Sequence, residues 1–185
     1  MIKALRFTDN YRCFKKDLLI EFKPDINLLV GDQGAGKSTL ISILTAHDFD
    51  GVAKVDVKGK NNYWAFDFEN NNPRISPLPM NSLGFRETVV SRFNSHGEVV
   101  NRILSGLESI PDDVGVILMD EPDMALSVRS CVKLAKLLKT LGKKYQLIIT
   151  AHNPIIISSQ EEVLCLEKNK EWMKSSKFLT YHGMK

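Results

Sequence analysis

The stretch GDQGAGKSTL at residues 31–40 constrains the fold of this chain more than any other feature. It fits the pattern G-x-x-x-x-G-K-S/T, which binds phosphate when a strand precedes it and a helix follows. The apolar run INLLV at 26–30 is typical of a buried strand, and STLISILTA at 38–46 carries apolar residues at helical spacing. The sequence therefore predicts a strand, a glycine-rich loop and a helix, in the order that nucleotide-binding α/β proteins use.

The residue types of this loop suit a polyphosphate. Glycines let the backbone bend closely around an anion and turn its N–H groups toward it. Lys37 is expected to reach the β- and γ-phosphates of ATP, and the hydroxyl of Ser38 to bind Mg²⁺. We expect the nucleotide to be contacted along the whole loop, by Gly31, Asp32, Gln33, Gly34, Ala35, Gly36, Lys37, Ser38 and Thr39.

The composition fits one globular domain of 185 residues. The net charge of +3 is mild, so it neither requires nor excludes a nucleic-acid partner. No apolar run is long enough to span a membrane and the N-terminus lacks a signal-peptide core, so we expect no membrane insertion and a cytoplasmic location. The cysteines Cys13, Cys131 and Cys165 have no metal-binding spacing and predict reduced thiols in the core.

Apolar patterns predict the other elements. Continuous apolar runs at 114–119 and 145–150 are typical of strands that are covered on both faces of a parallel sheet. Amphipathic spacing indicates helices over 98–110 and 127–142, the second of them ended by Gly142. Near the N-terminus we expect strands at 2–14 and 17–24, and after the first helix a hairpin over 52–59 and 61–69. An irregular segment is expected at 70–94, and closing strands at 163–167 and 177–181.

These elements together predict an α/β fold of the P-loop NTPase type. Its core would be a parallel sheet, and the alternating strands near the two ends suggest an added antiparallel β layer. The helix over 127–142 would turn one side toward the core, formed by Val128, Cys131, Leu134, Ala135, Leu138 and Leu141.

Two adjacent carboxylates follow the buried run at 114–119. Open α/β sheets bind ligands at the carboxyl ends of their strands, which is where Asp120 and Glu121 lie. A hard cation prefers carboxylate oxygen, so Asp120 suits Mg²⁺. Glu121 suits a base that polarises the attacking water. The alternative is two solvated acids before Pro122, and the phosphate loop makes that alternative less attractive.

Two further stretches could complete such a site. His152 ends the strand at 145–150 and could support the γ-phosphate, although a lone histidine is more often structural. The stretch SHGE at 95–98 reads as a capping box, with Ser95 capping a helix and Glu98 three residues later. Ser95 and Gly97 could also form an anion site that closes on the γ-phosphate held by another subunit.

This set of motifs resembles the ATP-binding-cassette (ABC) ATPases. The phosphate loop, the Ser-x-Gly-Glu stretch, DEP after a buried strand and a strand-end histidine occur in that family's order. The opening, LRFTDNYRCFKKDLLIEFKPDINLLVG, is similar to the start of RecF-like and SMC-like ATPases, and the chain also resembles small stand-alone ATPases of bacteria and phages. That resemblance implies nucleotide contacts from the first strand, with Asn10, Tyr11 and Arg12 as candidates and an ordinary exposed turn as the alternative.

Three departures from the family pattern matter. No glutamine lies between the phosphate loop and the Ser-x-Gly-Glu stretch, where the family places one at Mg²⁺; Asp67 or Glu69 could substitute. Ser127 stands where the family tends to have an aspartate, and it could simply cap the next helix. Only 58 positions separate Lys37 from Ser95, so this interval has no room for an SMC-type coiled coil.

The leading hypothesis is an ABC-type ATPase of the RecF/SMC-like branch in DNA repair, DNA maintenance or phage-related processes. By resemblance, two copies would sandwich two Mg-ATP head to tail, and Lys37, Glu121 and His152 would act in hydrolysis. The first alternative is a slow ATP-dependent switch that gates a protein effector, and the second is a transporter's ATPase subunit. DNA is a possible partner because basic residues lie on and beyond the helix over 127–142.

Overall fold

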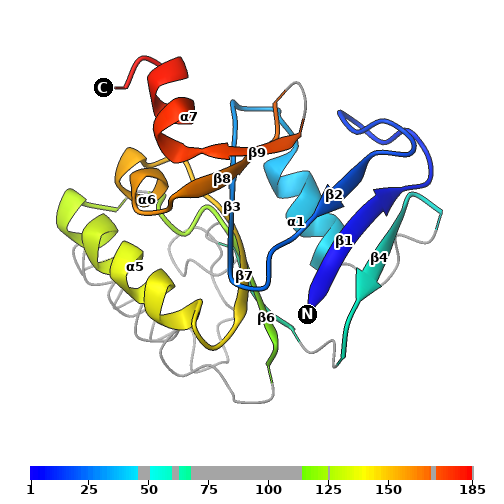
Figure 1. The fold of residues 1–185 in the computed structure, drawn as a ribbon, viewed down its shortest axis with the longest axis horizontal. Helices are drawn as coiled ribbons and strands as arrows, with labels where there is room; N and C mark the ends of the chain where they lie inside the picture. The colour runs from blue at the N-terminus through cyan, green and yellow to red at the C-terminus, as the bar shows by residue number, and fades with distance from the viewer. Residues whose placement is uncertain (46–50, 60–62, 68–113, 125, 168–169, 185) are drawn as a thin grey trace, which may run out of the picture.

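The computed structural model describes residues 1–45, 51–59, 63–67, 114–124, 126–167 and 170–184 (Figure 1). They form two β-sheets and helices on both sides of the larger one. The strands are β1 Ile2–Phe7, β2 Leu19–Glu21, β3 Ile26–Val30, β4 Ala53–Val57, β5 Tyr63–Asp67, β6 Val116–Asp120, β7 Gln146–Thr150, β8 Glu162–Cys165 and β9 Glu171–Lys174. The helices are α1 Lys37–Thr45, α5 Val128–Leu141, α6 Pro154–Ser158 and α7 Ser175–Tyr181.

The larger sheet has the order β5-β6-β7-β3-β8-β9. Its pairs are parallel from β5 to β8, and β9 closes the edge antiparallel to β8. A hydrophobic core lies on each face of this sheet, and alternate residues of a central strand belong to different cores. Leu28 and Val30 of β3 pack with α5, whereas Leu29 packs with α1. Burial on both faces explains why the sequences of β3, β6 and β7 are almost wholly apolar.

The smaller sheet has the order β2-β1-β4 and is antiparallel. It shares a core with α1 and one face of the larger sheet, and Figure 1 shows α1 between the two sheets. The stacked rings of Phe7 and Phe14, 4.5 Å apart, lie in this core. The expected architecture, a parallel core sheet with an added antiparallel layer, is therefore confirmed.

The expected hairpin over 52–59 and 61–69 is wrong. β4 pairs with β1 in the smaller sheet, whereas β5 pairs with β6 in the larger one. Alternating residues identify strands but do not identify their partners, and each of these strands pairs with a segment distant in sequence.

The expected strand at 177–181 is also wrong, because these residues belong to helix α7. The edge strand is β9, whose Met173 and Trp172 pair in register with Val163 and Leu164 of β8. The short helix α6, which was not expected, begins after Asn153, whose side chain accepts from Ile155 N–H. In a short apolar run, tertiary packing decides between helix and strand.

Helix α5 follows the expectation with one exception. Ser127 caps it by accepting from Ser130 N–H, and the expected apolar side is buried except for Val128, which is 70% exposed. Gly142 ends the helix in an ordinary right-handed conformation, so it is not a left-handed cap. A Cβ at this position would lie 2.6 Å from Cγ1 of Ile26, which explains the glycine by close packing.

Cys131 and Cys165 are buried as expected, but Cys13 is exposed, so the expectation of three core thiols is wrong for Cys13. Burial raises the pKa of the Cys131 and Cys165 thiols. In the described part of the chain, no helix is long and apolar enough to cross a membrane. The expected irregular segment at 70–94 and helix at 98–110 lie outside the described residues.

Candidate nucleotide-binding site

The phosphate loop runs from the end of β3 into α1, as the sequence predicts. Gly31, Gly34 and Gly36 have positive φ, a conformation that L side chains rarely adopt. At Gly36 an added Cβ would also lie 2.4 Å from Cys13 Sγ, so only glycine fits there. A backbone held in this shape at the start of a helix fits the cradle that polyphosphates require.

Lys37 is buried at the first position of α1. Its Nζ donates to two carbonyls of its own loop, Gly31 O at 2.8 Å and Asp32 O at 3.1 Å. Burial lowers the pKa of Lys37, although the carboxylates of Glu121, Asp120, Asp32 and Glu167 act in the opposite direction. The ammonium therefore interacts electrostatically with both acids at the end of β6, Asp120 and Glu121, and its Nζ is held against the carbonyls of its own loop.

Arg12 meets the phosphate loop from the turn after β1. Its Nη1 donates to Oγ1 of Thr39 at 2.9 Å, and its guanidinium lies over the ring of Tyr11. Arg12 has a positive φ of 50°, a conformation that costs a non-glycine residue free energy. The structure thus places Arg12 beside the end of the phosphate loop, at Thr39 in the first turn of α1. The nucleotide contact that the resemblance implies for Arg12 stays a prediction.

Asp120 and Glu121 are linked to the neighbouring strand by Thr150, which the sequence reasoning passed over. The hydroxyl of Thr150 donates to Oδ1 of Asp120 at 2.6 Å and accepts from the backbone N–H of Glu121 at 2.8 Å. β6 and β7 pair in parallel, which places their carboxyl ends side by side. The available signal was the polar threonine at the end of the apolar run LII, directly before Ala151 and His152.

Glu121 and His152 face each other across this edge of the sheet. Glu121 Oε1 lies 3.1 Å from His152 Nε2. Glu121 has a positive φ of 48°, and such strain in a non-glycine residue is frequent at functional sites. Both side chains are partly exposed, so they remain accessible to water and to a ligand.

Asp123 is a second residue that the sequence reasoning missed. It is buried, and its Oδ2 accepts from the backbone N–H groups of His152 at 2.9 Å and Asn153 at 2.6 Å. This carboxylate therefore fixes the loop that carries His152 to the loop that carries Glu121.

The start of the phosphate loop and the Glu121–His152 pair line one pocket of about 430 Å³. Its lining consists of Gly31, Asp32 and Gln33 of the loop, Glu121 after β6, Ala151 and His152 after β7, and Ile157, Phe178, His182 and Met184 from α6 and the C-terminal segment. Gly34 and Ala35 line an adjoining pocket. The polypeptide thus brings an anion cradle and an acid–histidine pair to one cavity.

For the remaining predicted residues the structure gives a position but no side-chain contact within the site, or no description at all. Ser38 is exposed at the start of α1, and α1 packs against β6, which ends at Asp120. Hydroxyl and carboxylate oxygens are suitable Mg²⁺ ligands, so the donor set of Ser38 and Asp120 fits that ion. The backbone of Asp67 pairs in register with Asp120. Ser95, Gly97, Glu98 and Glu69 lie outside the described residues.

Together, the parallel sheet, the phosphate loop and the strand-end DE pair with its histidine define a P-loop protein of ABC/SMC-like fold. The chain belongs to the family described as AAA domain, whose model matches residues 8–177. No curated protein matches it.

Solved structures share the fold at low sequence identity. The SMC head domain from Thermotoga maritima is 14% identical with a TM-score of 0.58, and the match covers 89% of this chain and 94% of that one. The ADP conformation of MJ1267, an ATP-binding cassette of an ABC transporter, is 16% identical with a TM-score of 0.59, over 97% of this chain and 95% of that one.

Proposed function

We propose that this protein hydrolyses ATP in a Mg²⁺-dependent reaction and that ATP binding joins two copies head to tail. The observation that carries the proposal is the shared pocket, in which the phosphate loop faces the Glu121–His152 pair. A phosphate cradle alone would suit binding. A carboxylate–histidine pair beside it supplies the groups that hydrolysis needs.

Each residue has a role that follows from its chemistry. The glycine loop and Lys37 hold the phosphates, and Arg12 approaches the nucleotide beside Thr39. The Glu121 carboxylate accepts a proton from the water that attacks the γ-phosphorus, and His152 orients the water and the γ-phosphate. Ser38 and Asp120 would hold Mg²⁺, which offsets the negative charge of the phosphates.

The second copy completes the site in this proposal. Ser95 and Gly97 of each chain would close on the γ-phosphate held by the other, as the resemblance to ABC ATPases implies. Contacts that exist only with ATP bound make the dimer a ligand-controlled state, and hydrolysis would release them.

We expect Glu121→Gln to stop turnover while leaving ATP binding intact, because glutamine keeps the shape of glutamate but cannot take a proton. The variant should accumulate as an ATP-bound dimer. The measurements are phosphate release, expected to fall on the order of 100-fold or more, and solution mass by light scattering with and without Mg-ATP. Glu161→Gln, an exposed acid remote from the pocket, is the matched control.

The same measurements distinguish the biological roles. Phosphate release stimulated by DNA would favour a repair or maintenance ATPase, and the exposed lysines of α5, Lys133, Lys136 and Lys139, are a surface that DNA could contact. Slow turnover indifferent to DNA would favour a switch that gates a protein effector. A Glu121→Gln variant that stays monomeric at saturating Mg-ATP would contradict the sandwich.

A further inference from the structure

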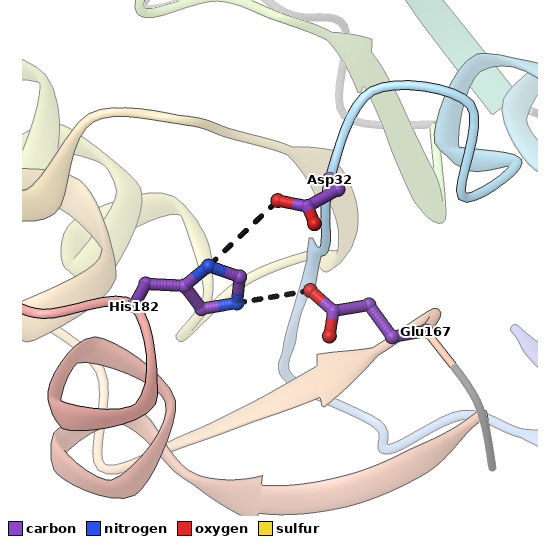
Figure 2. A group of neighbouring side chains, drawn as sticks. All are labelled: Asp32, Glu167 and His182. Atoms are coloured by element: carbon purple, nitrogen blue, oxygen red, sulfur yellow. Dashed lines mark ion pairs between the residues drawn. The ribbon is translucent and has the colours of Figure 1, made fainter.

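A histidine and two carboxylates from three distant segments meet beside the phosphate loop (Figure 2). Asp32 is the second residue of the loop, Glu167 follows β8, and His182 follows α7. Nδ1 of His182 lies 3.7 Å from Oδ1 of Asp32, and its Nε2 lies 2.9 Å from Oε1 of Glu167. None of the motifs recognised in the sequence includes Glu167 or His182.

The fold places each of these side chains firmly. β8 pairs with β3, so Glu167 packs against Gly31, where an added Cβ would lie 3.4 Å from its Cγ. The ring of His182 lies 4.4 Å from the ring of Phe178, which is anchored in the core, and its backbone N–H donates to Phe178 O. Two of the three groups are thus fixed by packing before any ligand is present.

The cluster is incomplete as a hydrogen-bonded group. Within the described part of the chain, Oε1 of Glu167 and Nε2 of His182 are buried, and neither has a hydrogen-bond partner beyond their own 2.9 Å ion pair. Buried polar atoms with unused hydrogen-bonding capacity cost free energy, so a cation that both atoms contact would stabilise this arrangement.

The spacing suits a metal ion. One ligand atom from each residue can be chosen so that all three lie within 4.8 Å of one another. Ligands of a tetrahedral ion with bonds of about 2.1 Å lie roughly 3.4 Å apart. The side chain of Asp32 is 78% exposed, so it is free to rotate and close the remaining gap.

The ligand atoms, one imidazole nitrogen and two carboxylate oxygens, indicate which metal ions the cluster would bind. Imidazole nitrogen favours zinc and other transition metals, whereas Mg²⁺ and Ca²⁺ prefer oxygen alone. The two carboxylates supply negative charge. The nearby ammonium of Lys170 donates to the carbonyls of Leu166 and Ala35. With three protein ligands, a fourth position would remain for water.

We propose that Asp32, Glu167 and His182 form a binding site for one divalent transition-metal ion, with Zn²⁺ as its probe. The ion links the phosphate loop to the C-terminal turn, across 150 positions of sequence. Because it binds the folded chain and not the unfolded one, it raises the stability of the fold by mass action. The site uses neither of the proposed Mg²⁺ ligands, Ser38 and Asp120, so zinc binding is tested without ATP. Asp32 and His182 also line the pocket proposed to bind the nucleotide, so the ion would lie at the edge of that pocket.

The test uses the full chain with zinc chloride and without nucleotide. Bound zinc is counted by mass spectrometry after dialysis, its affinity is measured by calorimetry, and the melting temperature is recorded with and without zinc. The variants are His182→Gln, Glu167→Gln and Asp32→Asn. His152→Gln and Cys13→Ser are controls, because each removes another group in the described region that could take zinc.

We expect one zinc ion per chain in the wild type and in both controls, with a rise in melting temperature. Each of the three cluster variants should bind zinc at least about tenfold more weakly and lose that rise. Asp32 is exposed, so Asp32→Asn should fold normally. It therefore still tests the proposal if substitution of His182 or Glu167 prevents folding. Absence of zinc binding by the wild type, unchanged binding by the cluster variants, or loss confined to a control would overturn the proposal.

Discussion

Asp123 shows how one buried side chain can position a site without touching its ligand. Its Oδ2 accepts two backbone N–H bonds from the loop after β7, and the two loops it joins carry Glu121 and His152. Hydrogen bonds to a carboxylate are among the stronger ones in proteins. Asp123 therefore supports the 3.1 Å approach of Glu121 to His152 through hydrogen bonds to the backbone of the His152 loop.

Replacing Asp123 with alanine should slow ATP turnover on the order of 10- to 100-fold, because small misplacements of a reacting group are costly. We expect kcat to fall while the KM for ATP changes little. The Asp123→Ala/His152→Ala double variant should be no slower than His152→Ala alone, since both changes act through the same histidine.

Asp123→Asn is the conservative comparison for this prediction. Its amide oxygen can still accept from both N–H groups, so most of the activity should remain. Additive losses in the double variant, or a raised KM with unchanged kcat, would contradict a positioning role.

At the scale of elements, buried amides hold the two sheets together. Gln146 begins β7, accepts from the N–H of Ile2 at 2.7 Å, and donates to Ile2 O at 2.6 Å and Lys23 O at 2.8 Å. Its side-chain amide therefore hydrogen-bonds to backbone groups as a neighbouring strand would, at the junction between the smaller sheet and the larger one. A glutamine in an apolar strand is explained by these three bonds.

Gln146→Leu should lower the free energy of unfolding by about 3 kcal/mol, because it removes three hydrogen bonds, two of them to the buried N–H and C=O of Ile2. Urea unfolding followed by circular dichroism would measure the loss. Gln160→Leu is a suitable control, since Gln160 is only partly buried and its Nε2 bonds a neighbouring serine. Equal effects of the two substitutions would show that the sheet junction does not depend on Gln146.

At the scale of the whole molecule, the proposed head-to-tail dimer predicts that two inactive variants can restore each other. Lys37→Met would disable phosphate binding by a chain's own loop. Ser95→Arg would disable the Ser95–Gly97 stretch that is proposed to close on the γ-phosphate held by the other chain. In a mixed dimer, one of the two sites combines an intact Lys37 with an intact Ser95.

Random mixing makes half of the dimers mixed, each with one of two sites intact, so about a quarter of the wild-type activity should return. Phosphate release by each variant alone and by their mixture would measure this. No recovery in a mixture that light scattering shows to be dimeric would mean that Lys37 and Ser95 act within one chain.

The sequence alone determined the local chemistry of this protein. The glycine-rich loop and its flanking elements predicted β3 and α1, and the apolar runs predicted β6 and β7, because burial on both faces leaves a clear mark on composition. Position at the ends of those strands was enough to select Asp120, Glu121 and His152. The same periodicity placed α5 and its cap at Ser127.

Only the tertiary structure decided which segments meet. Alternation predicted β4 and β5 as strands but paired them wrongly, since strand pairing depends on distant partners. The apolar run in α7 became helical against the core, which carried His182 to the phosphate loop. The roles of Thr150, Asp123 and Gln146 likewise arise from contacts between loops and strands that are separate in sequence. A local sequence pattern shows which face of one segment is apolar enough to be buried. A functional site depends on several segments that only the folded chain brings together.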